Sequence, residues 1–269
     1  MPIKLARPSS RVGSAYAGQR ILICGASGNL GGHLARQLSI DGVRLLLWGR
    51  DDCQLSSIAT ECRRSGAMVE TRSVDLCDAE AAIAALIEDD ELDAIDSAFF
   101  VAGIGDTREP GRIVEEPSQL IRHGQVNFLA PAALSAALGE RMARRGRGRL
   151  VLTGTAAATH PLPFAAGYTS SKCGLAHFAE AIRIALEPHG VSVTLVSPGF
   201  FAATPGSKGY GYARPGEISA HLLAQRMIAA AARGKSELVT PAHFYALRWV
   251  GKVLPRILSD RLIRALPSP

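Results

Sequence analysis

The feature that most constrains the fold of this chain is a regular alternation of apolar, strand-like runs with segments of helical spacing. Strands that alternate with helices predict βαβ units and therefore a parallel sheet. The strand-like runs are RILICG (20–25), VRLLLWGR (43–50), MVETRSVDL (68–76), AIDSAFFVAG (94–103), GRLVLTG (148–154), VSVTLVSPG (191–199) and SELVTP (236–241). We therefore predict a single doubly wound α/β domain with a parallel sheet of about seven strands.

Helical segments are expected between these strands, and they include a long helix over 117–145 and another over 166–187. Right-handed crossovers place such helices on both faces of the sheet, which is a Rossmann-type arrangement. Ligands of these sheets bind beyond the carboxyl ends of the strands. The loops that follow the strands are therefore expected to line the site.

The chain is long enough for one large α/β domain, and its 47% hydrophobic content can supply the core. We assign residues 19–242 to this domain. Residues 1–18 are basic and contain no acid, which predicts a disordered leader. A transit peptide is the alternative, although the segment has no apolar signal core.

Residues 243–269 form a basic, amphipathic extension that is expected to fold as two short helices with a break at Pro255. Its stripe of apolar residues favours packing against the substrate lid or a partner subunit. Weak contact of 243–266 with an anionic membrane surface is the alternative. The stripe comprises Leu247, Val250, Leu254, Leu258, Leu262 and Leu266.

Charge and cysteine usage exclude several classes of function. The net charge of +6 is concentrated at the two ends of the chain, not in a basic stripe with stacking aromatics, so we expect no nucleic-acid partner. The five cysteines show no ligand spacing, and the seven histidines show no HExxH-like pattern, so we expect no metal. Reduced thiols and the lack of an apolar run near ~18 residues predict a cytoplasmic protein.

A glycine-rich loop, CGASGNLGG (24–32), joins the first predicted strand to the first predicted helix. Glycines let the backbone turn tightly and approach a pyrophosphate, and a helix N-terminus offers N–H groups to the anion. The sequence therefore predicts a dinucleotide site, with a plain tight turn as the alternative. The residues expected to bind the cofactor here are Gly25, Ser27, Gly28, Asn29, Leu30 and Gly31.

The end of the second strand, Trp48-Gly49-Arg50, indicates which dinucleotide binds. An NAD site usually has a carboxylate here for the ribose 2′-OH, whereas a guanidinium fits a 2′-phosphate. Arg50 therefore favours NADP(H) over NAD(H). A solvated surface arginine is the alternative, and Asp51 and Asp52 could repel the phosphate.

Tyr168 and Lys172, in GYTSSKCGLAHF, are four residues apart and share one face of a predicted helix. A neighbouring ammonium favours the phenolate and lowers the pKa of a tyrosine from ~10. Such a phenol can exchange a proton with a reacting oxygen near neutral pH. A surface Tyr–Lys pair is the alternative.

Thr155 after a central strand, Asn127 on the long helix, the glycine loop and Ser197-Pro198-Gly199 extend this pattern. In order and spacing the set resembles the short-chain dehydrogenase/reductase family over about residues 18–242. The resemblance implies that Tyr168 is the general acid/base and that Lys172 holds the nicotinamide ribose. It places Thr155 where the family has a serine, and Asn127 where an asparagine holds a relay water. It adds further cofactor contacts at Asp75 and Leu76 in VDLCD, Ala102 and Gly103 of an NNAG-like segment, and Pro198, Gly199 and Thr204 of a PGxxxxT stretch.

The chain departs from the family pattern at several positions. Cys24 stands where a threonine is usual, and the glycine loop reads GxxGxxG. Phe100 and Val101 replace both asparagines of NNAG, which puts local rigidity in doubt more than chemistry. Thr155 keeps a hydroxyl donor, but its methyl group crowds the site.

The resemblance implies an NADP(H)-dependent oxidoreductase that transfers a hydride between nicotinamide and a carbonyl or secondary alcohol. Aromatic residues suggest a fairly apolar pocket, and residues 200–216 resemble the family's substrate lid. The alternative is a non-catalytic NADP(H)-binding redox sensor. The family also implies a homodimer or homotetramer. The aromatic residues are Phe164, Phe200, Phe201, Tyr210 and Tyr212.

Overall fold

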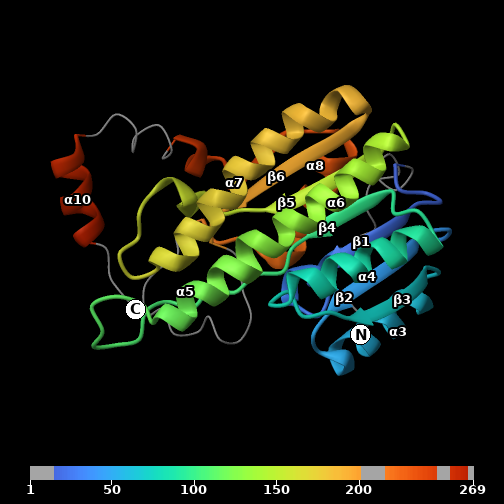
Figure 1. Cartoon of the computed structure of the whole chain (residues 1–269), viewed down its shortest axis with the longest axis horizontal. Coiled ribbons are helices and arrows are strands. Elements are labelled where there is room, and N and C mark those ends of the chain that lie inside the picture. The colour runs from blue at the N-terminus through green and yellow to red at the C-terminus, as the bar shows by residue number, and fades with distance from the viewer. Residues whose placement is uncertain (1–14, 201–215, 247–254, 266–269) are drawn as a thin grey trace.

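The computed structural model describes residues 15–200, 216–246 and 255–265. Its centre is a seven-stranded, fully parallel sheet in the order β3-β2-β1-β4-β5-β6-β7, which confirms the predicted fold class (Figure 1). The strands are β1 (Arg20–Cys24), β2 (Arg44–Gly49), β3 (Met68–Ser73), β4 (Ser97–Phe100), β5 (Gly148–Thr153), β6 (Val191–Pro198) and β7 (Glu237–Thr240). The chain winds outward from β1 to β3, then returns to place β4 on the other side of β1. The switch point of the topology therefore lies between β1 and β4.

Helices cover both faces of the sheet, as expected. They are α2 (Asn29–Leu38), α3 (Asp52–Arg64), α4 (Ala79–Leu92), α5 (Pro117–Gly124), α6 (Ala130–Arg144), α7 (Ala166–Leu186), α8 (Ala220–Ala232) and α10 (Arg256–Arg264), with shorter turns η1 (Gln125–Leu129), η2 (Ala156–Thr159) and η3 (Glu187–His189). Successive side chains of a strand point to opposite faces, so each strand contributes to two cores. Ile21 and Ile23 of β1 pack with α2, α3 and α8, whereas Leu22 packs with α4, α6 and α7.

The predicted long helix over 117–145 is the main correction to the secondary structure, because it is not one continuous α-helix. The chain follows that path, but a π-helical segment, η1, separates α5 from α6. Asn127 lies in this segment and is fully buried. Its side-chain amide accepts the N–H of Ile104 and donates to the carbonyl of Ile104, both at 2.9 Å. Short π-helical turns inside helices occur frequently at functional sites.

The boundary of the predicted leader is also corrected. Residues 1–14 lie outside the described part of the chain, but Tyr16 belongs to the core and is only 1% exposed. Its hydroxyl donates to the carbonyl of Ile228 in α8 at 3.0 Å, and its ring lies 6.4 Å from that of Phe99. The folded domain therefore begins before residue 19. A lone tyrosine among small residues, between Ala15 and Ala17, has no periodicity that would have revealed this.

At the other end, α10 begins directly after Pro255, where the sequence predicted a break. Leu258 and Leu262 are 49% and 61% exposed, so about half of each side chain faces solvent. Figure 1 shows α10 away from the sheet. The remaining apolar positions of the predicted stripe, Leu247, Val250, Leu254 and Leu266, lie outside the described residues. Among the helices that the structure describes, none has both the length and the apolarity to span a membrane.

Candidate active site

The carboxyl ends of the strands bring the predicted site residues to one edge of the sheet. The sequence included all of these residues except Thr155 in the last part of the strand-like runs, whereas in the structure each lies after the end of its strand. Strands β1, β4 and β5 are neighbours at the centre. The residues in question are Gly25 after β1, Arg50 after β2, Asp75 after β3, Ala102 after β4, Thr155 after β5 and Gly199 after β6. Thr204 lies outside the described residues, as do Phe201, Tyr210 and Tyr212.

The glycine loop packs so closely that side chains are excluded at two positions. Gly25 has φ +100°, and a Cβ placed on it would lie 2.5 Å from the Ala102 nitrogen. A Cβ on Gly31 would lie 2.1 Å from the carbonyl oxygen of Gly25. The helix that follows, α2, begins at Asn29, and its N-cap Gly28 provides no side-chain cap. This loop fits the phosphates of a dinucleotide, because it joins a close backbone approach to a helix N-terminus.

The atypical residues around this loop keep its backbone bonding. Val101 and Ala102 both donate their N–H groups to the carbonyl of Cys24 at 2.9 Å, so the ends of β1 and β4 stay joined without the NNAG asparagines. Phe100 is buried in the core. Burial raises the pKa of the Cys24 thiol to about 12, so it remains protonated in the position of the usual threonine.

Arg50 is exposed at the tip of β2. The carboxylate of Asp51 accepts the N–H of Gln54 at 2.9 Å and thereby caps α3. Because that carboxylate is engaged by the helix, part of its charge is offset locally. A Cβ on Gly49 would lie 2.5 Å from Ser27 Oγ, so the glycine loop directly contacts the end of β2.

Asp75 and Leu76 differ in how they relate to the site. Asp75 is exposed, and one of its carboxylate oxygens accepts the N–H of Cys77 at 3.0 Å. Leu76 is 6% exposed and its side chain packs in the core. Only the backbone of Leu76 can therefore contact a cofactor.

Lys172 lies at the centre of the edge. It is 4% exposed, and its Nζ donates to the carbonyl of Thr153, at the end of β5, at 2.8 Å. A Cβ on Gly103 would lie 3.3 Å from this Nζ and 3.1 Å from Asn127 Oδ1. Gly103 therefore brings bare backbone to the two predicted catalytic side chains. Burial lowers the pKa of Lys172 to about 8.

Asn127 and Thr155 complete this group. Asn127 Nδ2 also lies 3.3 Å from Ser171 Oγ, so its amide joins the segment after β4 to α7. Thr155 is 9% exposed, and its hydroxyl accepts the N–H of Ala157 at 3.3 Å. Since the hydroxyl acts there as an acceptor, its proton can still be donated to a ligand.

Tyr168 lies in the first turns of α7, one turn before Lys172. One edge of its ring approaches Gly105, where a Cβ would lie 3.8 Å from Tyr168 Cε2. The ring of His123 contacts it edge-on, with centroids 6.4 Å apart and an interplanar angle of 72°. His123 and its neighbour Glu115 were not identified from the sequence, because they come together only through the fold of the 104–124 segment.

The apolar side of the predicted pocket is described only in part. Phe200 is 37% exposed, and its ring lies 6.2 Å from that of Phe244. A Cβ on Gly199 would lie 2.2 Å from Phe244 Cε2, so this ring covers the glycine after Pro198. Phe164 is half-buried beside the 104–108 segment, whose Arg108 N–H it accepts. Phe244 is a further aromatic wall that the sequence did not single out.

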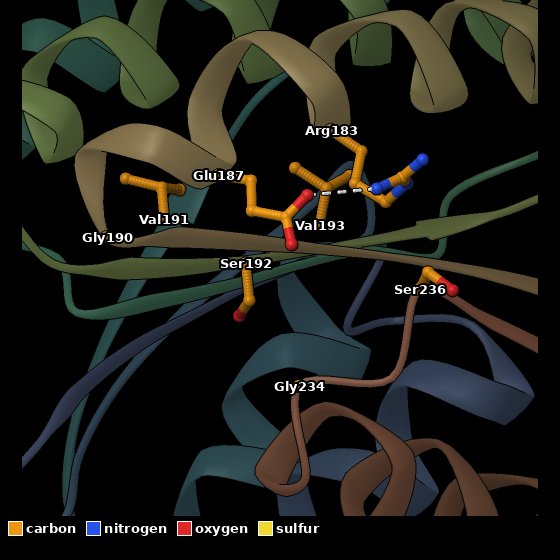
Figure 2. A pocket seen from close by; sticks show the side chains of 8 residues that line it. All are labelled: Arg183, Glu187, Gly190, Val191, Ser192, Val193, Gly234 and Ser236. Carbon is orange, nitrogen blue, oxygen red and sulfur yellow. Dashed lines mark hydrogen bonds and ion pairs between the residues drawn. The ribbon is translucent and has the colours of Figure 1, made fainter.

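A separate, partly open pocket of about 200 Å³ lies near the opposite edge of the sheet (Figure 2). It is bounded by the end of α7 and the first residues of β6, including Val191 and Val193. The ion pair between Arg183 and Glu187, at 3.1 Å, borders it. Since it lies at the amino end of β6, it is remote from the glycine loop and from Lys172.

This combination of fold and edge residues defines a dinucleotide-binding oxidoreductase domain, and comparison with known proteins agrees. The profile of the short chain dehydrogenase family matches residues 19–212. An uncharacterized oxidoreductase from Myxococcus xanthus is 32% identical over 246 residues, which cover 91% of this chain and 96% of that protein.

Two solved structures are similar along most of their length. A metagenomic short-chain oxidoreductase in complex with NADP is 26% identical, with a TM-score of 0.71 over 84% of this chain and 98% of that one. A short-chain dehydrogenase from Sphingobium yanoikuyae in complex with NADPH is 24% identical, with a TM-score of 0.77 over 93% and 96%. The chain belongs to the short-chain dehydrogenase/reductase family of nicotinamide-dependent oxidoreductases.

Proposed function

We propose that the protein is an NADP(H)-dependent oxidoreductase that interconverts a carbonyl group and a secondary alcohol on a fairly apolar substrate. The observation that carries this proposal is the position of Lys172. Its Nζ is buried between the Thr153 carbonyl and Gly103, beside Asn127 and one helical turn after Tyr168. Lysine side chains are seldom buried unless they are paired or serve a function, because desolvation of the charge is costly.

The nicotinamide, when bound, supplies the hydride chemistry. In this proposal Tyr168 gives a proton to the substrate oxygen during reduction and takes it back during oxidation. The Thr155 hydroxyl donates a second hydrogen bond to the same oxygen as negative charge develops. Lys172 holds the ribose hydroxyls and favours the phenolate of Tyr168, and Asn127 keeps the segment after β4 in place beside it.

The cofactor proposal rests on the glycine loop and on Arg50. Gly25, Ser27, Gly28, Asn29, Leu30 and Gly31 hold the pyrophosphate at the start of α2, and Arg50 holds a 2′-phosphate. Asp75, the Leu76 backbone, Ala102, Gly103, Pro198, Gly199 and Thr204 contact the remainder. The NADP and NADPH named in the two similar structures support this preference.

The catalytic proposal is tested by NADPH oxidation with a panel of aromatic ketones, ketoacyl esters and quinones. We expect turnover with at least one apolar carbonyl, and a loss of at least ~100-fold in Tyr168→Phe with unchanged NADPH affinity. Tyr245→Phe, at a tyrosine that is 52% exposed, is the matched control and should retain full activity. If the wild type binds NADPH but turns over no substrate, the redox-sensor alternative replaces the enzyme proposal.

The partner proposals concern assembly and α10. We propose a homodimer or homotetramer, in keeping with the family, and a location in the cytoplasm. The sequence left open packing on the substrate lid or a partner subunit and, as the alternative, contact with an anionic membrane surface. The exposed Leu258 and Leu262 can serve the last two. Light scattering and vesicle co-sedimentation, each with and without residues 243–269, separate the two: loss of assembly supports the first, and loss of sedimentation the second.

A further inference from the structure

A buried acid and a buried histidine lie directly behind Tyr168. The side chains of Glu115 and His123 are 1% and 0% exposed, and Glu115 Oε1 is 3.6 Å from His123 Nδ1. This Oε1 and both ring nitrogens of His123 have no hydrogen-bond partner. Burying unpaired polar atoms in this way costs free energy. Other contacts of these two residues must therefore compensate for that cost.

Glu115 replaces the missing cap of α7. The N-cap of this helix, Ala165, has no side chain that can accept a hydrogen bond. Instead, Glu115 Oε2 accepts the N–H of Gly167 at 2.8 Å. A carboxylate at this position satisfies a free helical N–H and interacts favourably with the helix dipole. Glu115 therefore fixes the turn of α7 that carries Tyr168, from a loop more than fifty residues away.

His123 contacts the tyrosine itself. Its ring meets the Tyr168 ring edge-on, and Gly105 lies against the tyrosine as well. Burial lowers the pKa of His123; Glu115 and Asp106 oppose that effect, and Arg122 adds to it. The neutral imidazole is thus an aromatic wall for the phenol, and its Nδ1 lies 3.6 Å from the carboxylate that caps the helix.

Gly167 shows how closely the group is packed. A Cβ on this glycine would lie 2.7 Å from Leu120 Cδ2, 2.8 Å from His123 Nδ1 and 3.3 Å from Glu115 Oε1. The residue before Tyr168 therefore has no room for a side chain. A side chain here would press on the histidine and the acid that flank Tyr168.

We propose that Glu115 and His123 are positioning residues for Tyr168. Glu115 holds the first turn of α7 and His123 holds the phenol ring, so that the hydroxyl meets the reacting oxygen in one orientation. This inference rests on the proposed function for its kinetic consequences. Its structural part, the fixing of the first turn of α7 by Glu115, stands independently of it.

The kinetic test compares truncated and shape-conserving variants. We expect kcat to fall about tenfold or more in Glu115→Ala, with KM and the NADPH Kd within about twofold, because one hydrogen bond to a charged group is lost. Glu115→Gln keeps an acceptor for Gly167 and should stay within about threefold of wild type. In this Gln background, His123→Phe should retain kcat and His123→Ala should lose it. Glu109→Ala, an exposed acid of the same loop, and His177→Ala, an exposed histidine of α7, are the controls.

Amide hydrogen exchange of the peptide that covers 166–170 provides a readout without substrate. We expect exchange at Gly167 to be about tenfold faster in Glu115→Ala and unchanged in Glu109→Ala. If the wild type shows no turnover but Gly167 still exchanges faster in Glu115→Ala, the positioning of α7 by Glu115 stands and the proposed function is rejected. Normal exchange together with normal kcat in Glu115→Ala, or equal losses in the Gln and Ala variants, would overturn the inference.

Discussion

Lys172 is the residue at which burial and charge oppose each other most directly. Its ammonium donates to the Thr153 carbonyl, and burial lowers its pKa to about 8 from the ordinary 10.5. Near pH 7 the folded protein therefore holds a costly charge, which is useful only if a ligand or a phenolate stands beside it. This cost is measurable in the protein without cofactor.

Lys172→Met should change how stability depends on pH. Between about pH 8 and 10.5 the unfolded chain keeps this proton while the folded chain has lost it, so the lysine raises wild-type stability as pH rises through that window. Relative to the variant, the wild type should gain up to ~3 kcal/mol of unfolding free energy between pH 7 and 10. Paired urea denaturation at each pH measures the difference. A difference that stays flat over this range would show that Lys172 keeps its ordinary pKa.

Arg50 tests the choice of cofactor at a single exposed guanidinium. Arg50→Ala should weaken NADPH binding about tenfold, because a charge-assisted contact with the 2′-phosphate is lost. NADH binding should not change, since NADH lacks that phosphate. Fluorescence titration with both cofactors measures the ratio, and Arg64→Ala, an exposed arginine at the end of α3, is the control. Equal losses for NADPH and NADH would assign Arg50 no part in discrimination.

At the scale of the elements, the glycine loop shows which contacts depend on the fold. Gly31→Ala puts a Cβ 2.1 Å from the Gly25 carbonyl oxygen, and a backbone atom has little freedom to move away. We expect a loss of ~3 kcal/mol in unfolding free energy, together with weaker binding of either cofactor. Gly124→Ala meets nothing within 4 Å at the end of α5 and should be neutral or slightly stabilising. Thermal unfolding of the two variants in parallel gives the comparison; similar stabilities would contradict the close packing of the loop.

The sequence predicted the elements well where periodicity is strong and missed what depends on distant contacts. β1 and β2 were placed to within a residue, because strands buried on both faces read as continuous apolar runs. The π-helical turn at Asn127 was missed, because it is accompanied by two hydrogen bonds to the distant backbone of Ile104, which local helix propensity does not reveal. Glu115 was missed for the same reason: its partner Gly167 is far away in the sequence, and nothing around a lone acid in a loop indicates a helix cap.

At the scale of the whole molecule, the two ends of the domain meet through Tyr16. This residue lies before the first strand, yet its ring packs near Phe99 of the central β4 and its hydroxyl bonds to Ile228 of α8, 212 residues later. The guanidinium of Arg149 also lies 5.4 Å from the centre of the ring. Helix α8 covers one face of the sheet, so this contact joins the beginning of the domain to its last helical layer.

Tyr16→Ala should therefore destabilise the whole domain by ~3–5 kcal/mol, the usual cost of removing a buried aromatic ring. Tyr16→Phe keeps the ring and removes only the hydrogen bond to the Ile228 carbonyl, so it should cost ~1 kcal/mol. Urea denaturation of both variants, with Tyr245→Phe as the exposed control, measures the two contributions separately. If Tyr16→Ala is as stable as the wild type, Tyr16 does not belong to the folded domain. If Tyr16→Phe and Tyr16→Ala lose equal unfolding free energy, the hydroxyl and not the ring holds the two ends together.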